Sequence, residues 1–254
     1  MRKSDFDDFY ALEENLWWFA GMRDITAALL DSLPVAAGAN VLDAGCGTGL
    51  MLTWLKRNVT AGTVLGIDLD PTALSYTHER GHAQIARASV GELPFPSQTF
   101  DLVTSFDVLV QLPGAEMDTL AIREMFRVLK PGGFAFVRAA AYKWMRSGHD
   151  EALGTQRRYN LADLAGRLER EGFRVIRATY ANTWLFPLAV VRRLLLKRVG
   201  LANAGSDVRQ LPRGVRWMNG VLHGVLRAEA GHLRRPGSRY RFGLSAICVA
   251  QRPS

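Results

Sequence analysis

The residues best suited to chemistry are three closely spaced glycines and an acid that follows them along the chain. Residues 41–49 read VLDAGCGTG, so that Gly45, Gly47 and Gly49 occupy alternate positions after a short apolar run. Because glycine has no Cβ, this turn can take left-handed backbone conformations and approach a ligand closely. Asp68 ends the next apolar run, a place from which a carboxylate accepts hydrogen bonds from both hydroxyls of a ribose. The two features together predict a nucleoside-binding site.

The neighbours of the glycine turn separate two classes of nucleoside. In the dinucleotide fingerprint a small residue stands where this chain has Leu50, and Asp43 adds a negative charge that would repel a pyrophosphate. No Gly-Lys-Ser/Thr sequence follows the turn, which disfavours a phosphate-binding loop. Asp43 suits a ligand with sulfonium and ammonium groups, if only through an ordered water. The residues therefore favour S-adenosylmethionine over a dinucleotide such as NAD.

The elements that position these residues alternate between strand and helix. Apolar runs predict strands at 41–43, 63–68, 85–89, 100–105, 134–139, 173–180 and 244–250. Helical spacing predicts helices at 5–33, 50–58, 117–129, 161–171, 185–199 and 215–233, and another that starts at Pro71. Short connections between alternating elements require a parallel sheet with crossover helices. We expect an α/β, Rossmann-like fold, with a seven-stranded mainly parallel sheet, helices on both faces, and ligands at the carboxyl ends of the strands.

Length and composition fit one elaborated domain. The chain has 254 residues, 48% of them hydrophobic and 22% charged, which excludes disordered, collagen-like and coiled-coil proteins. We expect an N-terminal helical cap at 1–34, a core at 35–181 and 243–254, and a helical insertion at 182–242. Acids near the start and the lack of a long uncharged apolar run predict a cytoplasmic location. No metal is expected, because the cysteines and histidines lack metal-ligand spacing.

The positive charge is concentrated in the insertion. The chain has 32 basic and 24 acidic residues, a net charge of +8, and residues 182–242 hold twelve of the basic and two of the acidic ones. Such a segment attracts phosphates, anionic lipids or acidic partners, although a solvated arginine-rich helical face shows the same composition. Three interpretations stay open: a lid over an acceptor, a homodimer contact, and a basic amphipathic helix at 184–201 on a membrane surface.

Four stretches carry a resemblance to a known family. They read DAGCGTG at 43–49, GIDLDP at 66–71, LPFPSQTFDLV at 93–103 and REMFRVLKPGGF at 123–134. Residues 40–139 thereby resemble a class I S-adenosylmethionine-dependent methyltransferase of the type-11 group, which includes quinone C-methyltransferases. The resemblance implies that the glycine turn holds the methionyl part of the cofactor and that Asp68 holds the ribose. It places the adenine against Ser89 and Val90, with Ser89 where relatives commonly have aspartate.

The N-terminal segment completes the predicted cofactor site. Residues 12–24, LEENLWWFAGMRD, are similar to a helix that covers the cofactor in a subgroup of this family. This similarity brings Trp18 to the site and Arg23 to the cofactor carboxylate, which a guanidinium binds in bidentate fashion. A helix that merely packs on the core would show the same pattern. The predicted cofactor-binding residues are Asp43, Gly45, Cys46, Gly47, Gly49, Asp68, Leu69, Ser89, Val90, Phe106, Trp18 and Arg23.

Candidate catalytic and acceptor-binding residues follow the fourth and fifth predicted strands. Residues 149–159, HDEALGTQRRY, resemble a stretch that recurs in the same subgroup. His149 is the candidate base, because the adjacent Asp150 would raise its proton affinity. Gln111, Arg158 and Tyr159 are candidate acceptor contacts. In the alternative interpretation Arg158 and Tyr159 only dock the following helix, and Gln111 is a polar residue at a helix start.

The resulting hypothesis is methyl transfer to a small-molecule acceptor: a natural product, lipid, quinone or sugar. In-line displacement at an activated methyl group depends mainly on positioning the nucleophile and excluding water. Two alternatives stay open: a nucleic-acid-modifying methyltransferase that uses the basic segment, and a cofactor-binding member of the fold that does not methylate. Ser105-Phe106-Asp107 stands where base-amino methyltransferases have an Asn/Asp-Pro-Pro-aromatic turn, so a nucleic-acid partner is not expected.

Overall fold

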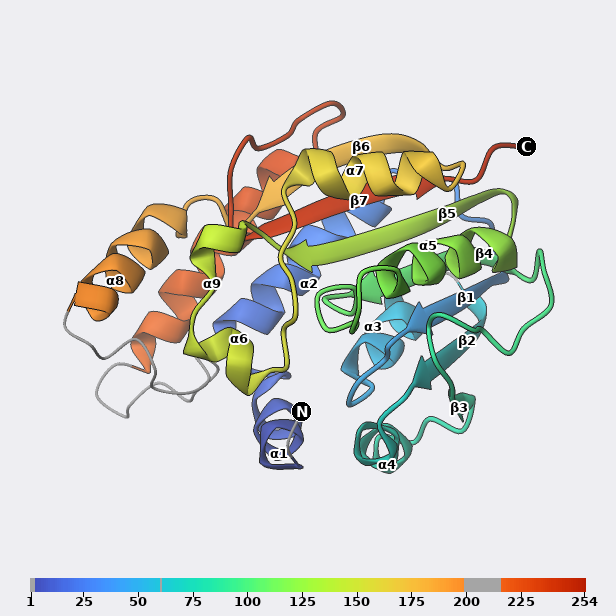
Figure 1. Ribbon diagram of the computed structural model, residues 1–254, viewed down its shortest axis with the longest axis horizontal. Helices are drawn as coiled ribbons and strands as arrows, with labels where there is room; N and C mark the ends of the chain where they lie inside the picture. The colour runs from blue at the N-terminus through green and yellow to red at the C-terminus, as the bar shows by residue number, and fades with distance from the viewer. Residues whose placement is uncertain (1–2, 60, 199–215) are drawn as a thin grey trace.

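The computed structural model describes residues 3–59, 61–198 and 216–254, which form a seven-stranded sheet between two layers of helices (Figure 1). The strands are β1 (Ala39–Ala44), β2 (Ala61–Asp68), β3 (Ile85–Arg87), β4 (Phe100–Phe106), β5 (Leu129–Ala140), β6 (Arg174–Ala181) and β7 (Ser245–Gln251). Their order across the sheet is β3-β2-β1-β4-β5-β7-β6. Only β7 runs antiparallel to its neighbours, β5 and β6. The predicted Rossmann-like α/β fold is confirmed.

The strand order reverses beside β1, and this reversal fixes where a ligand binds. β1 pairs with β2 on one side, where Asp43 lies opposite Gly66, and with β4 on the other, where Asp43 lies opposite Thr104. Open α/β sheets bind ligands at the carboxyl ends of their strands beside such a reversal. The last residues of β1, β2 and β4 and the turns that follow them carry most of the predicted cofactor residues, and the topology brings these segments to one edge of the sheet.

Helices cover both faces of the sheet. On one face lie α5 (Met117–Val128) and α7 (Leu161–Arg170); on the other lie α2 (Trp17–Leu30), α3 (Leu50–Asn58) and α9 (Trp217–Leu233). In Figure 1, α5 and α7 are in front of the sheet and α2 and α9 are behind it. The fully buried residues of α5 are Ala121, Ile122, Met125 and Val128, with Asp118. Their helical spacing builds the apolar stripe that packs on the sheet, as the sequence pattern predicted.

The second helix of the predicted insertion belongs to the core. α9 packs so closely on α2 that a Cβ at Gly21 would lie 2.4 Å from Leu226. His223 of α9 and Asp24 of α2 approach to 2.8 Å, and Leu226 is buried in the same apolar cluster as β5 and β7. The N-terminal cap and α9 therefore form one layer. The first helix of the insertion, α8 (Phe186–Arg198), lies beyond them at one end of the molecule (Figure 1).

The N-terminal segment forms two helices rather than the single one predicted at 5–33. α1 (Lys3–Leu12) ends where a turn begins, and α2 starts at Trp17. The guanidinium of Arg23 donates to the carbonyl oxygens of Glu13 and Glu14 in that turn, at 2.7 and 2.8 Å. Carbonyl groups that leave a helix need new partners. Here a side chain from the next helix supplies them, which hydrophobic periodicity does not reveal.

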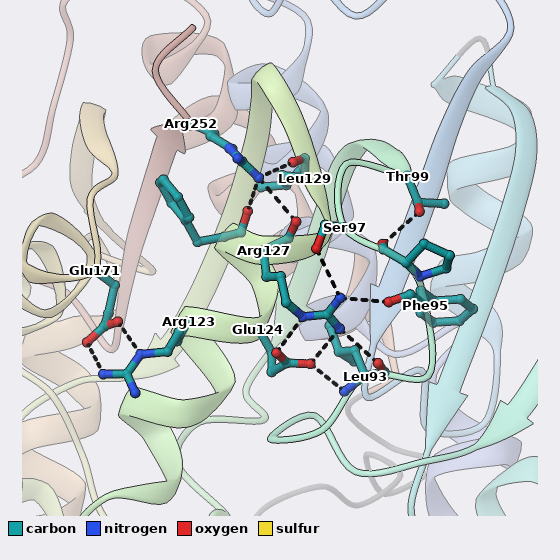
Figure 2. Close-up of polar contacts among 12 residues, drawn as sticks. Leu93, Phe95, Ser97, Thr99, Arg123, Glu124, Arg127, Leu129, Glu171 and Arg252 are labelled. Carbon is teal, nitrogen blue, oxygen red and sulfur yellow. Dashed lines mark hydrogen bonds and ion pairs between the residues drawn. The ribbon is translucent and has the colours of Figure 1, made fainter.

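Two of the stretches that carry the family resemblance stabilise the edge of the sheet opposite the predicted site. Figure 2 shows Arg127 of α5 paired with Glu124 at 2.7 Å and donating to the carbonyl oxygens of Leu93 and Phe95. Arg252 donates to the carbonyl oxygen of Leu129 at 2.7 Å, where β5 begins. β5 thus starts five residues before the predicted strand at 134–139, and residues 131–133 lie at an irregularity within it.

Replacing Glu229 with alanine is expected to lower the free energy of unfolding by about 2–4 kcal/mol. Its buried carboxylate accepts hydrogen bonds from the amides of Thr183 and Trp184, at 2.9 and 3.2 Å, where the chain leaves β6. Burial raises the pKa of Glu229, so the folded state binds this proton more tightly than the unfolded state does. The unfolding free energy should therefore fall as the pH rises above the ordinary glutamate pKa, and Glu229→Gln should abolish this component. Urea denaturation at two pH values measures both effects; an alanine variant as stable as the wild type would contradict them.

Candidate cofactor site

The glycine turn after β1 leaves open space at one position only among its three glycines. Gly45, Gly47 and Gly49 all have positive φ, of 90°, 55° and 86°. A Cβ at Gly45 would lie 2.3 Å from Val108, and one at Gly49 would lie 2.8 Å from Thr77, whereas nothing lies within 4 Å of the position at Gly47. Packing therefore requires glycine at the outer two positions. At Gly47 the backbone is left accessible to a ligand.

Asp68, at the end of β2, is held against this turn by backbone amides. The amide of Gly47 donates to Oδ2 and that of Asp70 donates to Oδ1, each at 2.9 Å. Burial raises the pKa of Asp68, and the hydrogen bonds that the backbone amides donate to its carboxylate oppose that rise. Each carboxylate oxygen has more than one lone pair, so the group can accept two hydroxyls while the amides fix its orientation.

Asp43 places a second, deeper carboxyl group beneath the turn. It is 1% exposed, and its Oδ1 accepts a hydrogen bond from Thr104 Oγ1 at 2.8 Å. Burial raises the pKa of Asp43 to about 7; Asp68 adds to the rise, while Thr104 and Arg138 oppose it. A buried carboxyl with so high a pKa changes its charge near neutrality, and a positively charged ligand would favour its ionised form.

The residues predicted to contact the adenine, and Cys46 in the glycine turn, differ in how far they are buried. Cys46 is buried against Gly66, and burial raises the pKa of its thiol, so it packs as a neutral group. Val90 is buried, whereas Leu69 is 63% exposed and available to an adenine. The Oγ of Ser89 accepts from the amide of Gly91 at 3.2 Å. β3 ends at Arg87 rather than at the predicted residue 89, so Ser89 lies in the loop after the strand.

An ion pair at the ends of β4 and β5 was not predicted from the sequence. Arg138 pairs with Asp107 at 2.8 Å, and its guanidinium lies over the rings of Trp18 and Phe106 at 5.4 and 5.1 Å. Asp107 has a φ of 59°, a left-handed conformation that aspartate tolerates better than most residues. Two predicted cofactor residues, Trp18 and Phe106, are thus joined by a buried cation. The pairing of β4 with β5 brings Phe106 beside Arg138, and the packing of α2 brings Trp18 to them, so no local pattern could have revealed the ion pair.

A second unpredicted group fastens the N-terminal helices to the glycine turn. Glu13 accepts hydrogen bonds from Thr48 Oγ1, within the turn, and from Arg80 at 2.8 Å, at the end of α4 (Pro71–Glu79). Arg80 also donates to the carbonyl oxygen of Thr48 at 2.9 Å and lies over the ring of Tyr10. Burial raises the pKa of Glu13, while Thr48 and Arg80 oppose the rise. Arg23, predicted to bind the cofactor carboxylate, donates here to the backbone of residues 13 and 14.

Replacing Glu13 with glutamine is expected to speed dissociation of a nucleoside ligand by about tenfold, the size of one charge-assisted hydrogen bond. The change keeps the shape of the side chain but removes the charge that joins the α1–α2 turn to Thr48 and Arg80. Glu14→Gln is the matched control: Glu14 also pairs with Arg80, but it is exposed, so its loss should have little effect. Stopped-flow tryptophan fluorescence with S-adenosylhomocysteine measures both rates. Equal rates in the two variants would show that the contact does not retain the ligand.

The stretch at 149–159 is anchored by one internal ion pair and by a hydrogen bond to α5. Arg158 is buried against Asp150, with Nε 2.6 Å from Oδ1, and donates to the carbonyl oxygen of Ala141. Tyr159 is 1% exposed and donates to Asp118 at 2.7 Å. Burial would raise the pKa of Asp118, but Tyr159 and the nearby guanidinium groups hold it below its ordinary value. These contacts favour the interpretation in which Arg158 and Tyr159 dock the chain between β5 and α7.

The remaining candidate acceptor contact, Gln111, and the candidate base, His149, belong to the loop after β4 and to the chain after β5. Gln111 is exposed in the loop after β4, and its backbone amide donates to the carbonyl oxygen of Val108 at 2.9 Å. The backbone of His149 belongs to the short helix α6 (Gly148–Ala152), but its side chain lies outside the described part of the structure. Asp150, expected to raise the proton affinity of His149, is engaged by Arg158. In the described ranges no group of three His, Cys, Asp or Glu side chains is arranged to hold a metal ion.

The site fits a cationic nucleoside better than a dinucleotide. Gly47 gives backbone access, Asp68 offers two acceptor oxygens, and Asp43 places a buried carboxyl beneath them. Two carboxyl groups beside one turn would repel a pyrophosphate. Leu50 begins α3, where a dinucleotide-binding turn needs a small residue. Fold and site together define a Rossmann-like protein with a place for S-adenosylmethionine.

Comparison with known proteins gives the family. Residues 42–137 match the methyltransferase domain family. An uncharacterized methyltransferase of Schizosaccharomyces pombe is 31% identical over 199 residues, which cover 66% of this chain and 70% of that protein. A probable S-adenosylmethionine-dependent methyltransferase of Mycolicibacterium smegmatis is 30% identical over 167 residues, 65% of this chain and 62% of that protein. The chain therefore belongs to the class I S-adenosylmethionine-dependent methyltransferases, although it spans less than two thirds of the M. smegmatis relative.

A solved structure has a similar fold. A methyltransferase of Haloferax volcanii, in complex with the Trm112 methyltransferase activator, superimposes with a TM-score of 0.62 over 98% of each chain. The two sequences are 19% identical, so the likeness concerns the fold alone.

Proposed function

We propose that this protein transfers a methyl group from S-adenosylmethionine to a small-molecule acceptor: a natural product, lipid, quinone or sugar. The observation that carries the proposal is the placement of the buried carboxyl group of Asp43 and the partly buried carboxyl group of Asp68 around the accessible backbone of Gly47. When bound, the cofactor supplies a methyl group activated by a positively charged sulfur. Transfer breaks the sulfur–methyl bond, forms a bond from the acceptor to the methyl carbon, and leaves S-adenosylhomocysteine.

The residues of this chain would act mainly by positioning. Asp68 orients the ribose, Asp43 balances the positive charge of the ligand, and the α1–α2 turn with Trp18 covers the site and excludes water. The ion pair of Arg138 and Asp107 keeps Trp18 and Phe106 in place. An acceptor that holds its proton at neutral pH needs a base, and His149 is our candidate.

Ligand selectivity tests the proposal directly. Thermal unfolding is measured with S-adenosylmethionine, S-adenosylhomocysteine and NAD, because a ligand that binds the folded state raises the melting temperature. We expect the two sulfur nucleosides to raise it and NAD to leave it unchanged. Incubation with methyl-labelled S-adenosylmethionine and extracts of lipids, quinones and sugars then tests transfer. Stabilisation by NAD alone would overturn the cofactor assignment; binding without labelled product from any extract would favour the member of the fold that does not methylate.

The remaining predictions concern partners and location. A homodimer, contact of 184–201 with a membrane and residence in the cytoplasm stay predictions, as does the absence of a nucleic-acid partner. Part of the segment 184–201 lies outside the described residues. None of the helices in the described ranges has the length and hydropathy needed to cross a bilayer.

A further inference from the structure

We propose that the end of the molecule formed by α8, the loop after β5 and the chain before β7 docks on an anionic lipid bilayer. We call this surface the apolar-basic face. Its apolar members are Trp144, Trp184, Leu188, Val191 and Phe242, and its basic members are Lys143, Arg146, Arg192 and Arg241, all exposed. The docking itself is independent of the proposed function; only its consequence for the acceptor rests on it.

Exposed apolar side chains gather at this end. Of the ten large hydrophobic residues that are exposed in the described ranges, five belong to the apolar-basic face, and Trp217 and Val221 lie in the adjacent first turns of α9 at the same end (Figure 1). Single exposed apolar residues are ordinary, whereas a group of them marks an interaction site. Leu188 and Val191 of α8 are 63% and 53% exposed. One turn apart on the helix, they present an aliphatic surface beside Arg192.

The exposed rings pack against a cluster of other aromatic side chains. Tyr142 stacks on Tyr180 at 5.2 Å and contacts Trp144 and Phe186 at 5.7 and 5.6 Å between ring centres. Phe186 in turn contacts Phe242 at 5.7 Å. Trp144 and Phe242, each about half exposed, are therefore fixed before any partner arrives. Rings held in this way lose little conformational freedom on binding, and tryptophan favours the boundary between water and lipid.

The segments that carry these rings bear charge of one sign. Residues 141–148, 184–192, 216–227 and 234–244 contain lysines and arginines but no aspartate or glutamate. Glu229, which lies between the last two segments, is buried and bonded to backbone amides. Cations interspersed with apolar side chains are typical of surfaces that bind anionic lipids. Aliphatic Leu188 and Val191 offer no stacking surface to bases, so the composition favours a bilayer over a single-stranded nucleic acid.

The position of the face has a consequence for the acceptor. Tyr142 and Trp144 follow directly on β5, whose Arg138 lies beside the cofactor site. A bilayer on the apolar-basic face would therefore approach the carboxyl edge of the sheet. If the protein is a methyltransferase as proposed, this arrangement narrows its acceptor to an amphiphile that resides in the membrane.

Vesicle flotation with the full chain tests the docking. Vesicles contain phosphatidylcholine alone or with phosphatidylglycerol, and we expect binding only to the anionic ones, weakened by added salt. Trp144→Ser combined with Leu188→Ser should lower the partition coefficient by at least about tenfold, because both side chains would lose contact with lipid. Lys143→Glu with Arg146→Glu should do the same. Leu120→Ser, which changes an exposed leucine on α5, is the matched control and should bind like the wild type.

Affinity for S-adenosylhomocysteine, measured on each variant, separates docking from the cofactor site and verifies folding. Unchanged affinity with lost vesicle binding supports the proposal. Failure of the wild type to bind anionic vesicles, or undiminished binding by both double variants, would overturn it. So would light scattering that shows a dimer dissociated by Trp144→Ser and Leu188→Ser without any vesicle binding, or binding to RNA in place of vesicles.

Discussion

Alanine in place of Asp68 is expected to weaken the binding of S-adenosylhomocysteine by about a hundredfold, or ~3 kcal/mol, the size of two charge-assisted hydrogen bonds. Asp68 is the group that links the end of β2 to the glycine turn, through the amide of Gly47. Its loss removes both acceptors for the ribose and leaves that amide without its partner. Titration calorimetry measures the change.

A nearby acid provides the control for this experiment. Asp70 follows Asp68 in the same turn, but its Oδ1 caps α4 by accepting from the amide of Thr72 at 2.8 Å. Asp70→Asn keeps an oxygen for the cap, so the affinity should stay within about twofold of the wild type. Asp68→Asn, with one acceptor oxygen, should fall between the wild type and Asp68→Ala. If the alanine variant binds as tightly as the wild type, Asp68 does not hold the ribose.

The affinity for S-adenosylmethionine is expected to rise about tenfold between about pH 6 and about pH 8, since the ionised fraction of a group with a pKa of about 7 rises from about a tenth to about nine tenths. That group is Asp43, whose pKa is raised to about 7 by burial and by Asp68. The cationic cofactor favours its ionised form. S-adenosylhomocysteine lacks the sulfonium charge and should show a smaller rise. In Asp43→Asn the affinity for both ligands should become nearly independent of pH. If the affinity of this variant changes with pH as much as that of the wild type, another group causes the pH dependence.

The same carboxyl group should govern stability in the absence of ligand. Its pKa is higher in the folded state than the ordinary value of 3.8, so the folded state binds more protons than the unfolded state between about pH 4 and about pH 7. As the pH rises through this range, the contribution of Asp43 to the unfolding free energy therefore falls. Above about pH 7 the contribution has its most unfavourable value. Asp43→Asn should make the ligand-free protein more stable at about pH 8 by of order 2–4 kcal/mol. Urea denaturation at both ends of the window checks the sign.

Local patterns were sufficient to predict most of the elements. The strands at 41–43, 63–68 and 100–105 fall within β1, β2 and β4, and the helix at 50–58 coincides with α3. Apolar spacing and glycine turns are local properties, and they decide where a strand or helix can exist. The break between α1 and α2 and the early start of β5 escaped prediction, because Arg23 and Arg252 stabilise them from other elements.

In the cofactor site too, local patterns revealed some residues, whereas others could be found only in the folded structure. The glycine turn, Asp43 and Asp68 could be found in the sequence, since the constraint on each is a backbone conformation or the end of a strand, both written in neighbouring residues. The contacts that surround the site could not be found in the sequence. Glu13 contacts Thr48 and Arg80, and Arg138 contacts Asp107 and Trp18, and these residues are far apart along the chain. The sequence left open whether Arg158 and Tyr159 contact an acceptor or dock the following helix, and their contacts with Asp150 and Asp118 appear only in the fold. A side chain's type is local, but its burial and its partner are set by which strands and helices become neighbours, and that is decided only when the sheet assembles.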